Sequence, residues 1–121
     1  MLIRSQDKEM IVNVDAINHI LVDEAYRLNG SMYDVCADGM RLGYYSTKAK
    51  AMKVLDMIQK AYADFESAKI TSTGLVTVVY TGSYDTPDSV VDCKIKALKD
   101  YVEMIRELVV FQMPEDGSVE V

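Results

Sequence analysis

The sequence is poor in the residues that build metal and disulfide sites. It has a single histidine, His19, and two cysteines, Cys36 and Cys93, which are far apart and form no CxxC pair. A zinc site needs about four ligands, so none can be assembled at the usual spacings. We therefore expect two buried free thiols in a reducing compartment, and no metal or cofactor.

Long apolar runs are also missing. No run approaches the ~20 residues that a membrane helix needs, and the opening Met1-Leu2-Ile3-Arg4 lacks the apolar core of a signal peptide. The sequence has no linker, repeat or low-complexity segment, and half of its 121 residues are hydrophobic. These features predict a single domain over 1–121 with a substantial core, located in the cytoplasm.

Catalytic motifs are absent as well. No GxSxG, HExxH or P-loop pattern occurs. His19 lies within a short apolar stretch, where a lone histidine is most simply structural. The adjacent acids Asp23 and Glu24 are typical of a strand end that faces water. We therefore predict that the chain is not an enzyme and has no catalytic residues.

The net charge of −6 disfavours general binding to nucleic acid, since neutralising phosphates requires clustered lysine and arginine. Residues 40–60 are an exception, because their bases are opposed by Asp56 alone; the bases are Arg41, Lys48, Lys50, Lys53 and Lys60. This stretch suits a small anion better than a DNA duplex, although a solvated helix face is the plainer explanation. The sequence does not say whether Lys48, Lys50 or Lys53 contacts anything.

Residues 1–46 have the pattern of short strands that form an antiparallel sheet. Asn29-Gly30 and Asp38-Gly39 are turn signals, and the second predicts a type I′ hairpin. Residues 47–66 follow as a helix, which Ser46 or Thr47 can cap. Its apolar face recurs at steps of four and three residues: Ala51, Leu55, Ile58, Tyr62 and Phe65.

The second half predicts a strand at 75–80, a helix at 87–109 and a short strand at 110–113. The helix start is marked by Thr86-Pro87-Asp88. The threonine hydroxyl can cap the helix, proline suits its first position, and the aspartate charge is favourable at the positive end of the helix dipole. Residues 115–121 are expected to be a flexible tail. The predicted fold is therefore α+β: an N-terminal antiparallel sheet, two long helices, a central strand between them and a short C-terminal strand.

The second helix carries two apolar stripes. The first follows a heptad pattern through Val91, Ile95, Leu98, Val102, Ile105 and Val109. The second contains Ala97, Tyr101, Met104 and Leu108. One stripe is enough to dock a helix on a small domain, so the pair favours a homo-oligomer in which a partner subunit covers the first stripe. Deep burial of the helix within its own fold is the alternative.

Three features of the second half could form a ligand site. Tyr80 and Tyr84 offer aromatic faces on which nucleobases stack. Thr81 and Ser83 supply hydroxyls in a loop that opens onto a helix N-terminus, a favourable place for phosphate. Arg106 could clamp a phosphate with two hydrogen bonds, and Arg27 is a second basic candidate. The plainer reading makes Tyr80 a core residue and Arg106 a surface partner of Glu103 or Glu107; Asp85 and Asp88 also disfavour phosphate.

Several stretches resemble a family of small phage and prophage proteins of Firmicutes. They are the opening Met-Leu-Ile-Arg-Ser-Gln-Asp-Lys, the run from Leu42 to Ile58 and the closing Phe-Gln-Met-Pro-Glu-Asp of 111–116. The order strand, loop and arginine-bearing helix over 67–108 is similar to the Thoeris anti-defence sponge proteins. That resemblance implies a homo-oligomer that traps cyclic ADP-ribose-type signals, or cyclic oligonucleotides, without degrading them.

The same resemblance implies roles for individual residues. Tyr80 would stack on the ligand, 81–88 would close over it, and Arg106 and Arg27 would meet phosphate. An asparagine expected early in the helix could only correspond to Ser89 or Asp92, and the position of a second arginine is taken by Val110. These departures make the match one of arrangement more than of motif.

The expected function is thus a phage-encoded protein that sequesters a cyclic nucleotide. Two other functions remain open. One is an acidic protein–protein inhibitor of a host defence nuclease, similar to anti-CRISPR proteins, although the acids are scattered and do not form one run. The other is a structural or assembly protein of the phage particle, which the heptad pattern of the second helix would allow.

Overall fold

A computed structural model describes the backbone of residues 1–80 and 88–121, and the side chains of residues 1–71, 92–93 and 95–121. These parts form two compact units. The sheet unit is Met1–Tyr62 with Val110–Val121, and the helical unit is Ala63–Val109. The expectation of one domain over 1–121 stays a prediction.

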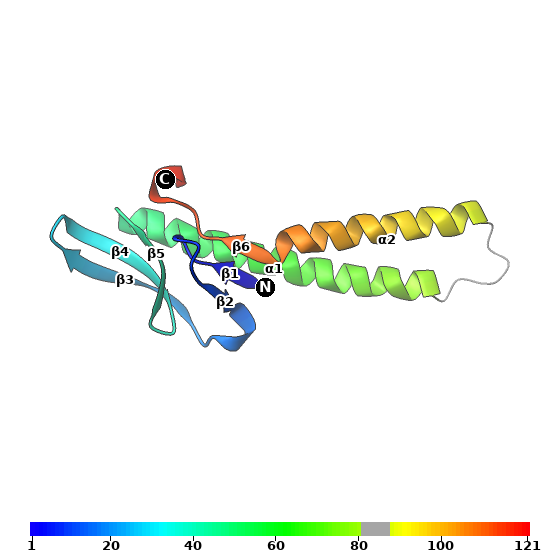
Figure 1. Ribbon diagram of the computed structural model, residues 1–121, viewed down its shortest axis with the longest axis horizontal. Coiled ribbons are helices and arrows are strands. Elements are labelled where there is room, and N and C mark those ends of the chain that lie inside the picture. Colours follow the sequence, from blue (N-terminus) through cyan, green and yellow to red (C-terminus); the bar gives the residue numbers. More distant parts are fainter. Residues whose placement is uncertain (81–87) are drawn as a thin grey trace. The chain divides into compact units, whose positions relative to one another are not determined.

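The described residues form six strands and two long helices, which confirms the α+β class (Figure 1). The strands are β1 (Leu2–Arg4), β2 (Ile11–Asn13), β3 (Ile20–Arg27), β4 (Gly30–Ala37), β5 (Met40–Tyr45) and β6 (Val110–Gln112). The helices are α1 (Lys48–Tyr80) and α2 (Asp88–Leu108), with short 3-10 turns at Val14–Ala16 and Asp116–Ser118.

The N-terminal strands form two sheets and not the single antiparallel sheet that the sequence suggested. One has the order β2-β1-β6 and the other the order β3-β4-β5. The first sheet is mixed, since β1 pairs antiparallel with β2 and parallel with β6, with Ile3 opposite Phe111. A pairing between strands more than 100 residues apart leaves no local pattern, which is why the sequence did not reveal it.

The hairpin of β4 and β5 has the predicted type I′ turn. Asp38 and Gly39 have φ angles of 47° and 84°, the left-handed values that this turn requires. The hairpin of β3 and β4 turns through residues 28 and 29, and β3 extends to Arg27 opposite Gly30. Asp23 and Glu24, which the sequence placed at a strand end, therefore lie inside β3, because pairing with β4 outweighs their composition.

The core of the sheet unit gathers side chains from both sheets, α1 and the C-terminal segment. The fully buried large residues are Tyr45, Ile3, Leu42, Met113, Val35 and Val54. From α1 the buried residues Ala51, Val54 and Ile58 follow steps of three and four, as one helix face should. Gly43 is closely surrounded in this core, since an added Cβ would lie 3.2 Å from the Tyr45 hydroxyl and would displace its neighbours by a few tenths of an ångström.

Helix α1 begins as predicted but runs much further. The amide of Lys50 donates to the Thr47 hydroxyl at 3.2 Å, so Thr47 is the cap. The helix continues to Tyr80, and the predicted strand over 75–80 is wrong. A β-branched residue costs only about 0.5 kcal/mol in a helix relative to alanine, whereas a strand needs a neighbour, and both sheets are built from other segments.

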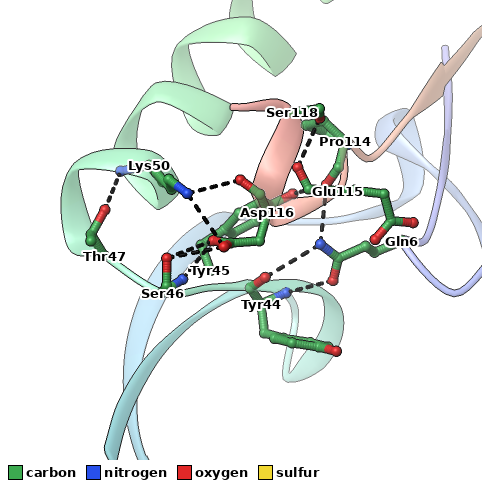
Figure 2. A network of polar contacts seen from close by, with 10 residues as sticks. All are labelled: Gln6, Tyr44, Tyr45, Ser46, Thr47, Lys50, Pro114, Glu115, Asp116 and Ser118. Atoms are coloured by element: carbon green, nitrogen blue, oxygen red, sulfur yellow. Dashed lines mark hydrogen bonds and ion pairs between the residues drawn. The ribbon is translucent and has the colours of Figure 1, made fainter. Parts of the chain in front are cut away.

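The segment after β6 is docked, although the sequence predicted a flexible tail. Val119 is buried. Asp116 binds Ser46, just before α1, and Lys50 in the first turn of α1 (Figure 2). Its carboxylate accepts from the Ser46 amide at 2.7 Å and from the Ser46 hydroxyl at 2.9 Å, and Lys50 Nζ lies 3.3 Å away. These bonds, the Ser46 amide first, hold the pKa of Asp116 below its ordinary 3.8.

Gln6 joins three segments through its side-chain amide (Figure 2). Its Oε1 accepts from the Tyr44 amide at 3.1 Å, and its Nε2 donates to the carbonyls of Tyr44 at 3.3 Å and Pro114 at 3.1 Å. The side-chain amide therefore makes the two hydrogen bonds to Tyr44 that a neighbouring strand would otherwise make at this edge of β5. The buried Tyr45 hydroxyl also donates to the Pro114 carbonyl, at 2.9 Å.

We predict that Gln6→Ala lowers the free energy of unfolding by about 2 kcal/mol, because several part-buried hydrogen bonds are lost together. Chemical denaturation measures the change. Gln59→Ala is the matched control, since Gln59 is exposed on α1 and its loss should cost less than about 0.5 kcal/mol. Equal effects of the two substitutions would show that the Gln6 bonds contribute nothing.

Asp116→Asn should destabilise the protein by about 1–2 kcal/mol at neutral pH. The lowered pKa means that the stabilisation is present above the ordinary value of 3.8 and is lost as the pH falls through the folded pKa. The difference between the native protein and Asp116→Asn should therefore vanish in acid in denaturation curves. Glu115→Gln, an exposed neighbouring acid, serves as the control.

Candidate functional site

The residues predicted to bind a ligand are distributed over both units. Tyr80 is the last residue of α1 and so does not end a strand. Ser89 is the second residue of α2, and Arg106 lies in its last turn. Thr81, Ser83 and Tyr84 lie outside the described residues. Arg27 belongs to β3 in the sheet unit.

Helix α2 presents its second apolar stripe to α1. Tyr101, Met104 and Leu108 line a pocket of about 390 Å³ within the helical unit. Its opposite wall comes from α1 and is mostly polar or small: Asp64, Ser67, Ala68 and Thr71. This stripe therefore docks the two helices of the unit against each other.

The first apolar stripe of α2 is partly exposed: Leu98, Ile105 and Val109 are half-buried, whereas Ile95 and Val102 are exposed, as Met104 of the second stripe also is. Ile95 is 39% exposed and Val102 is 40% exposed. Leu98 and Val102 line a shallow groove of about 270 Å³ together with Lys99, Glu103 and Arg106. These five positions share one helix face, because they recur at one, four, five and eight residues. An apolar groove edged by two cations and one acid can receive a partner helix or an anionic ligand.

Arg106 is exposed at the end of this groove. Where side chains are described, none forms an ion pair or a hydrogen bond with it, so the plainer reading that pairs it with Glu103 or Glu107 does not hold there. A guanidinium without such a partner can offer two parallel N–H donors to the oxygens of an anionic ligand.

The length of α2 sets a limit on the site. Seventeen residues separate Ser89 from Arg106 within the one helix. At a rise of 1.5 Å per residue this is about 26 Å. The two residues therefore cannot contact one small ligand from the same chain. The grouping expected from the sequence requires a second subunit.

Arg27 is held inside the sheet unit. Its Nη2 donates to both oxygens of Asp34, at 2.9 and 3.0 Å, and its guanidinium lies 5.3 Å from the centre of the Tyr44 ring. Arg41 lies 5.5 Å from the same ring. Tyr44 thus carries two cation–π contacts on the exposed face of this sheet. Burial, then the charges of Asp34 and Asp23, raise the pKa of the nearby Cys36 thiol.

The basic stretch 40–60 is less available than its sequence suggests. Lys50 donates to the Asp116 carbonyl at 2.9 Å and pairs with its carboxylate. Lys48 and Lys53 are exposed on α1, and no ion pair joins them to the described side chains. The local positive charge that remains is spread along the helix and does not converge on a pocket.

Metal and membrane sites were also considered. Within the ranges of the chain that the structure describes, no three residues of the types His, Cys, Asp and Glu are grouped as metal ligands. Across those same ranges, neither helix is both long and apolar enough to cross a membrane. The groove on α2 is therefore the site with the clearest chemistry.

Comparison with known proteins gives no family for the chain: no protein-family model, no curated protein and no solved structure matches it. The candidate site therefore depends on the residues of this chain alone.

Proposed function

We propose that the protein binds and sequesters a phosphate-bearing cyclic nucleotide, of the cyclic ADP-ribose or cyclic oligonucleotide class, without degrading it. The carrying observation is Arg106, an exposed arginine with no partner among the described side chains, at the end of an apolar groove. A guanidinium recognises phosphate through two parallel hydrogen bonds. The cytoplasm of an infected or lysogenic bacterium is the proposed location.

The site requires two subunits, and the first stripe of α2 supplies the means. If two copies of α2 pack antiparallel about Leu98, Ile95 lies opposite Val102 of the partner, and Val91 lies opposite Ile105. Such a seam buries the two half-exposed side chains Ile95 and Val102. The same register sets Lys96 beside the partner's Asp100, so the charges of the flanks also match.

This register would bring two of the predicted ligand residues, Arg106 and Ser89, close to each other across the seam. Arg106 of one subunit reaches the first turn of α2 in the other, where Ser89 is found. Tyr80 and residues 81–87 precede that turn in sequence. A phosphate would then meet the guanidinium from one chain and the helix N-terminus of the other, both of which attract negative charge. Aromatic stacking on Tyr80 or Tyr84 would hold a base.

Sequestration, and not turnover, fits the chemistry of the residues involved. Arginine, serine and tyrosine bind and orient a phosphate ester, but Arg106 cannot deprotonate to act as a base. The sole histidine, His19, is in the sheet unit, 3.4 Å from the carboxylate of Asp38. A tight complex that releases its ligand unchanged is the expected behaviour.

Arg106→Ala should weaken nucleotide binding by about 10- to 150-fold, the loss of a charged hydrogen bond worth about 1.5–3 kcal/mol. Isothermal titration with cyclic ADP-ribose isomers and cyclic trinucleotides measures it. Arg41→Ala in the sheet unit is the matched control and should bind normally. Normal binding by Arg106→Ala would contradict the proposed site.

Leu98→Asp should separate the subunits joined through α2, because it places two carboxylates at the centre of the seam. We expect a lower mass in analytical ultracentrifugation and loss of nucleotide binding in the same sample. Met57→Asp, which also replaces a partly exposed apolar residue with a charge on α1, should change neither property. A Leu98→Asp protein that stays assembled through α2 and binds ligand would exclude the two-subunit site.

A further inference from the structure

The four sheet edges of this protein are not equally protected. β2 and β6 are edges of only three residues. β5 is interrupted by a bulge near Leu42, and the side chain of Gln6 forms hydrogen bonds with the backbone amide and carbonyl of Tyr44. β3 is different, since it is eight residues long and its pairing with β4 has no bulge. Long regular edges are the ones that recruit another strand.

The register shows which peptide groups of β3 are free. Ala37 and Met40 flank the two-residue type I′ turn, so they exchange hydrogen bonds with each other. Along β4 the backbone hydrogen bonds alternate between its two neighbours, so that Ala37 bonds to β5 and residues such as Asp34 and Met32 bond to β3. Their partners in β3 are Asp23 and Ala25. The peptide groups of Val22, Glu24 and Tyr26 point to the open edge, and no residue of the described chain hydrogen-bonds them.

We propose that β3 pairs antiparallel with β3 of a second copy of this chain, about a two-fold axis at Ala25. In this arrangement Glu24 and Tyr26 exchange backbone hydrogen bonds with Tyr26 and Glu24 of the partner strand. The two three-stranded sheets become one continuous six-stranded sheet.

Charge selects this register over its alternatives. Side chains alternate between faces, so the strands can slip only by steps that keep each residue on its own face. A two-fold axis at Asp23 or Glu24 would set identical carboxylates against each other, which is destabilising. An axis at Tyr26 makes no charge pair. The axis at Ala25 alone sets Asp23 opposite Arg27 of the partner, and it does so twice.

The side chains around β3 have room for this contact. Arg27 binds Asp34 through Nη2 alone, which leaves the Nε and Nη1 donors for a second carboxylate. Asp23 is exposed and has no ion pair among the described side chains. Tyr26 and Leu28 are 83% and 107% exposed at the end of the hairpin. In the proposed register Leu28 lies opposite Val22 of the partner, so the contact covers an apolar side chain that one copy leaves in water.

This interface is separate from the α2 seam and does not depend on nucleotide binding. It uses the sheet unit, whereas the seam uses the helical unit. When its two-fold axis differs from that of the α2 seam, the two contacts together build an assembly larger than a dimer.

Disulfide trapping tests the register directly. Residues opposite each other at the axis form a non-hydrogen-bonded pair with Cα atoms about 4.5 Å apart, within the range that a disulfide spans. Ala25→Cys, in a chain with Cys36→Ser and Cys93→Ser, should form a covalent dimer on mild oxidation. The dimer should persist when Leu98→Asp is added, which separates this contact from the α2 seam.

Asp23→Cys in the same background is the matched control. Its two thiols would be about 13 Å apart along the strands in the proposed register and should not join. Cross-linking through Asp23→Cys but not Ala25→Cys would overturn the register, and cross-linking through neither would overturn the interface between two copies. Arg27→Asp should reduce the yield from Ala25→Cys several-fold, and adding Asp23→Arg should restore it.

Discussion

The parallel pairing of β1 with β6 is the contact on which the sheet unit depends. It joins the first strand of the chain to a strand that follows both long helices. Once β6 is in place, Met113 enters the core, Pro114 meets Gln6 and Tyr45, and Asp116 reaches the start of α1. Helices α1 and α2 thus lie in the sequence between β5 of one sheet and β6 of the other.

That topology separates two tasks along the sequence. The sheet unit supplies a buried core and a polar network in which each buried side-chain polar atom among the described residues has a partner. The helical unit carries the stripes that leave apolar and basic side chains exposed. Neighbouring exposed apolar residues are typical of a surface that binds a partner or a ligand. The proposed function places its ligand at the groove of the helical unit.

Much of the fold could be predicted from local pattern. The type I′ turn at Asp38-Gly39, the Thr47 cap, the extent of α2 and the last strand follow from turn chemistry, capping and periodicity. The strand predicted over 75–80 was wrong because β-branched composition is a weak preference that an existing helix overrides. The β1–β6 pairing and the Gln6 bridge join distant segments, and no local signal marks them.

The candidate site was predictable in part. The exposure of Arg106 beside Leu98 and Val102 agrees with the two-stripe pattern of α2. The predicted helix over 87–109 already implies that Ser89 and Arg106 are about 26 Å apart, and the continuous helix α2 agrees with it. Arg27, weighed as a ligand contact, is engaged by Asp34 and Tyr44. The contacts of Arg27 follow from strand pairing and could not be predicted from residue types.

Native mass spectrometry of the purified protein, mixed with cyclic ADP-ribose isomers and cyclic trinucleotides, tests the central claim most directly. The account predicts an oligomer that retains a cyclic nucleotide and, after heating, releases it with its mass unchanged. An oligomer that binds none of these nucleotides, or one that releases a hydrolysed product, would contradict it.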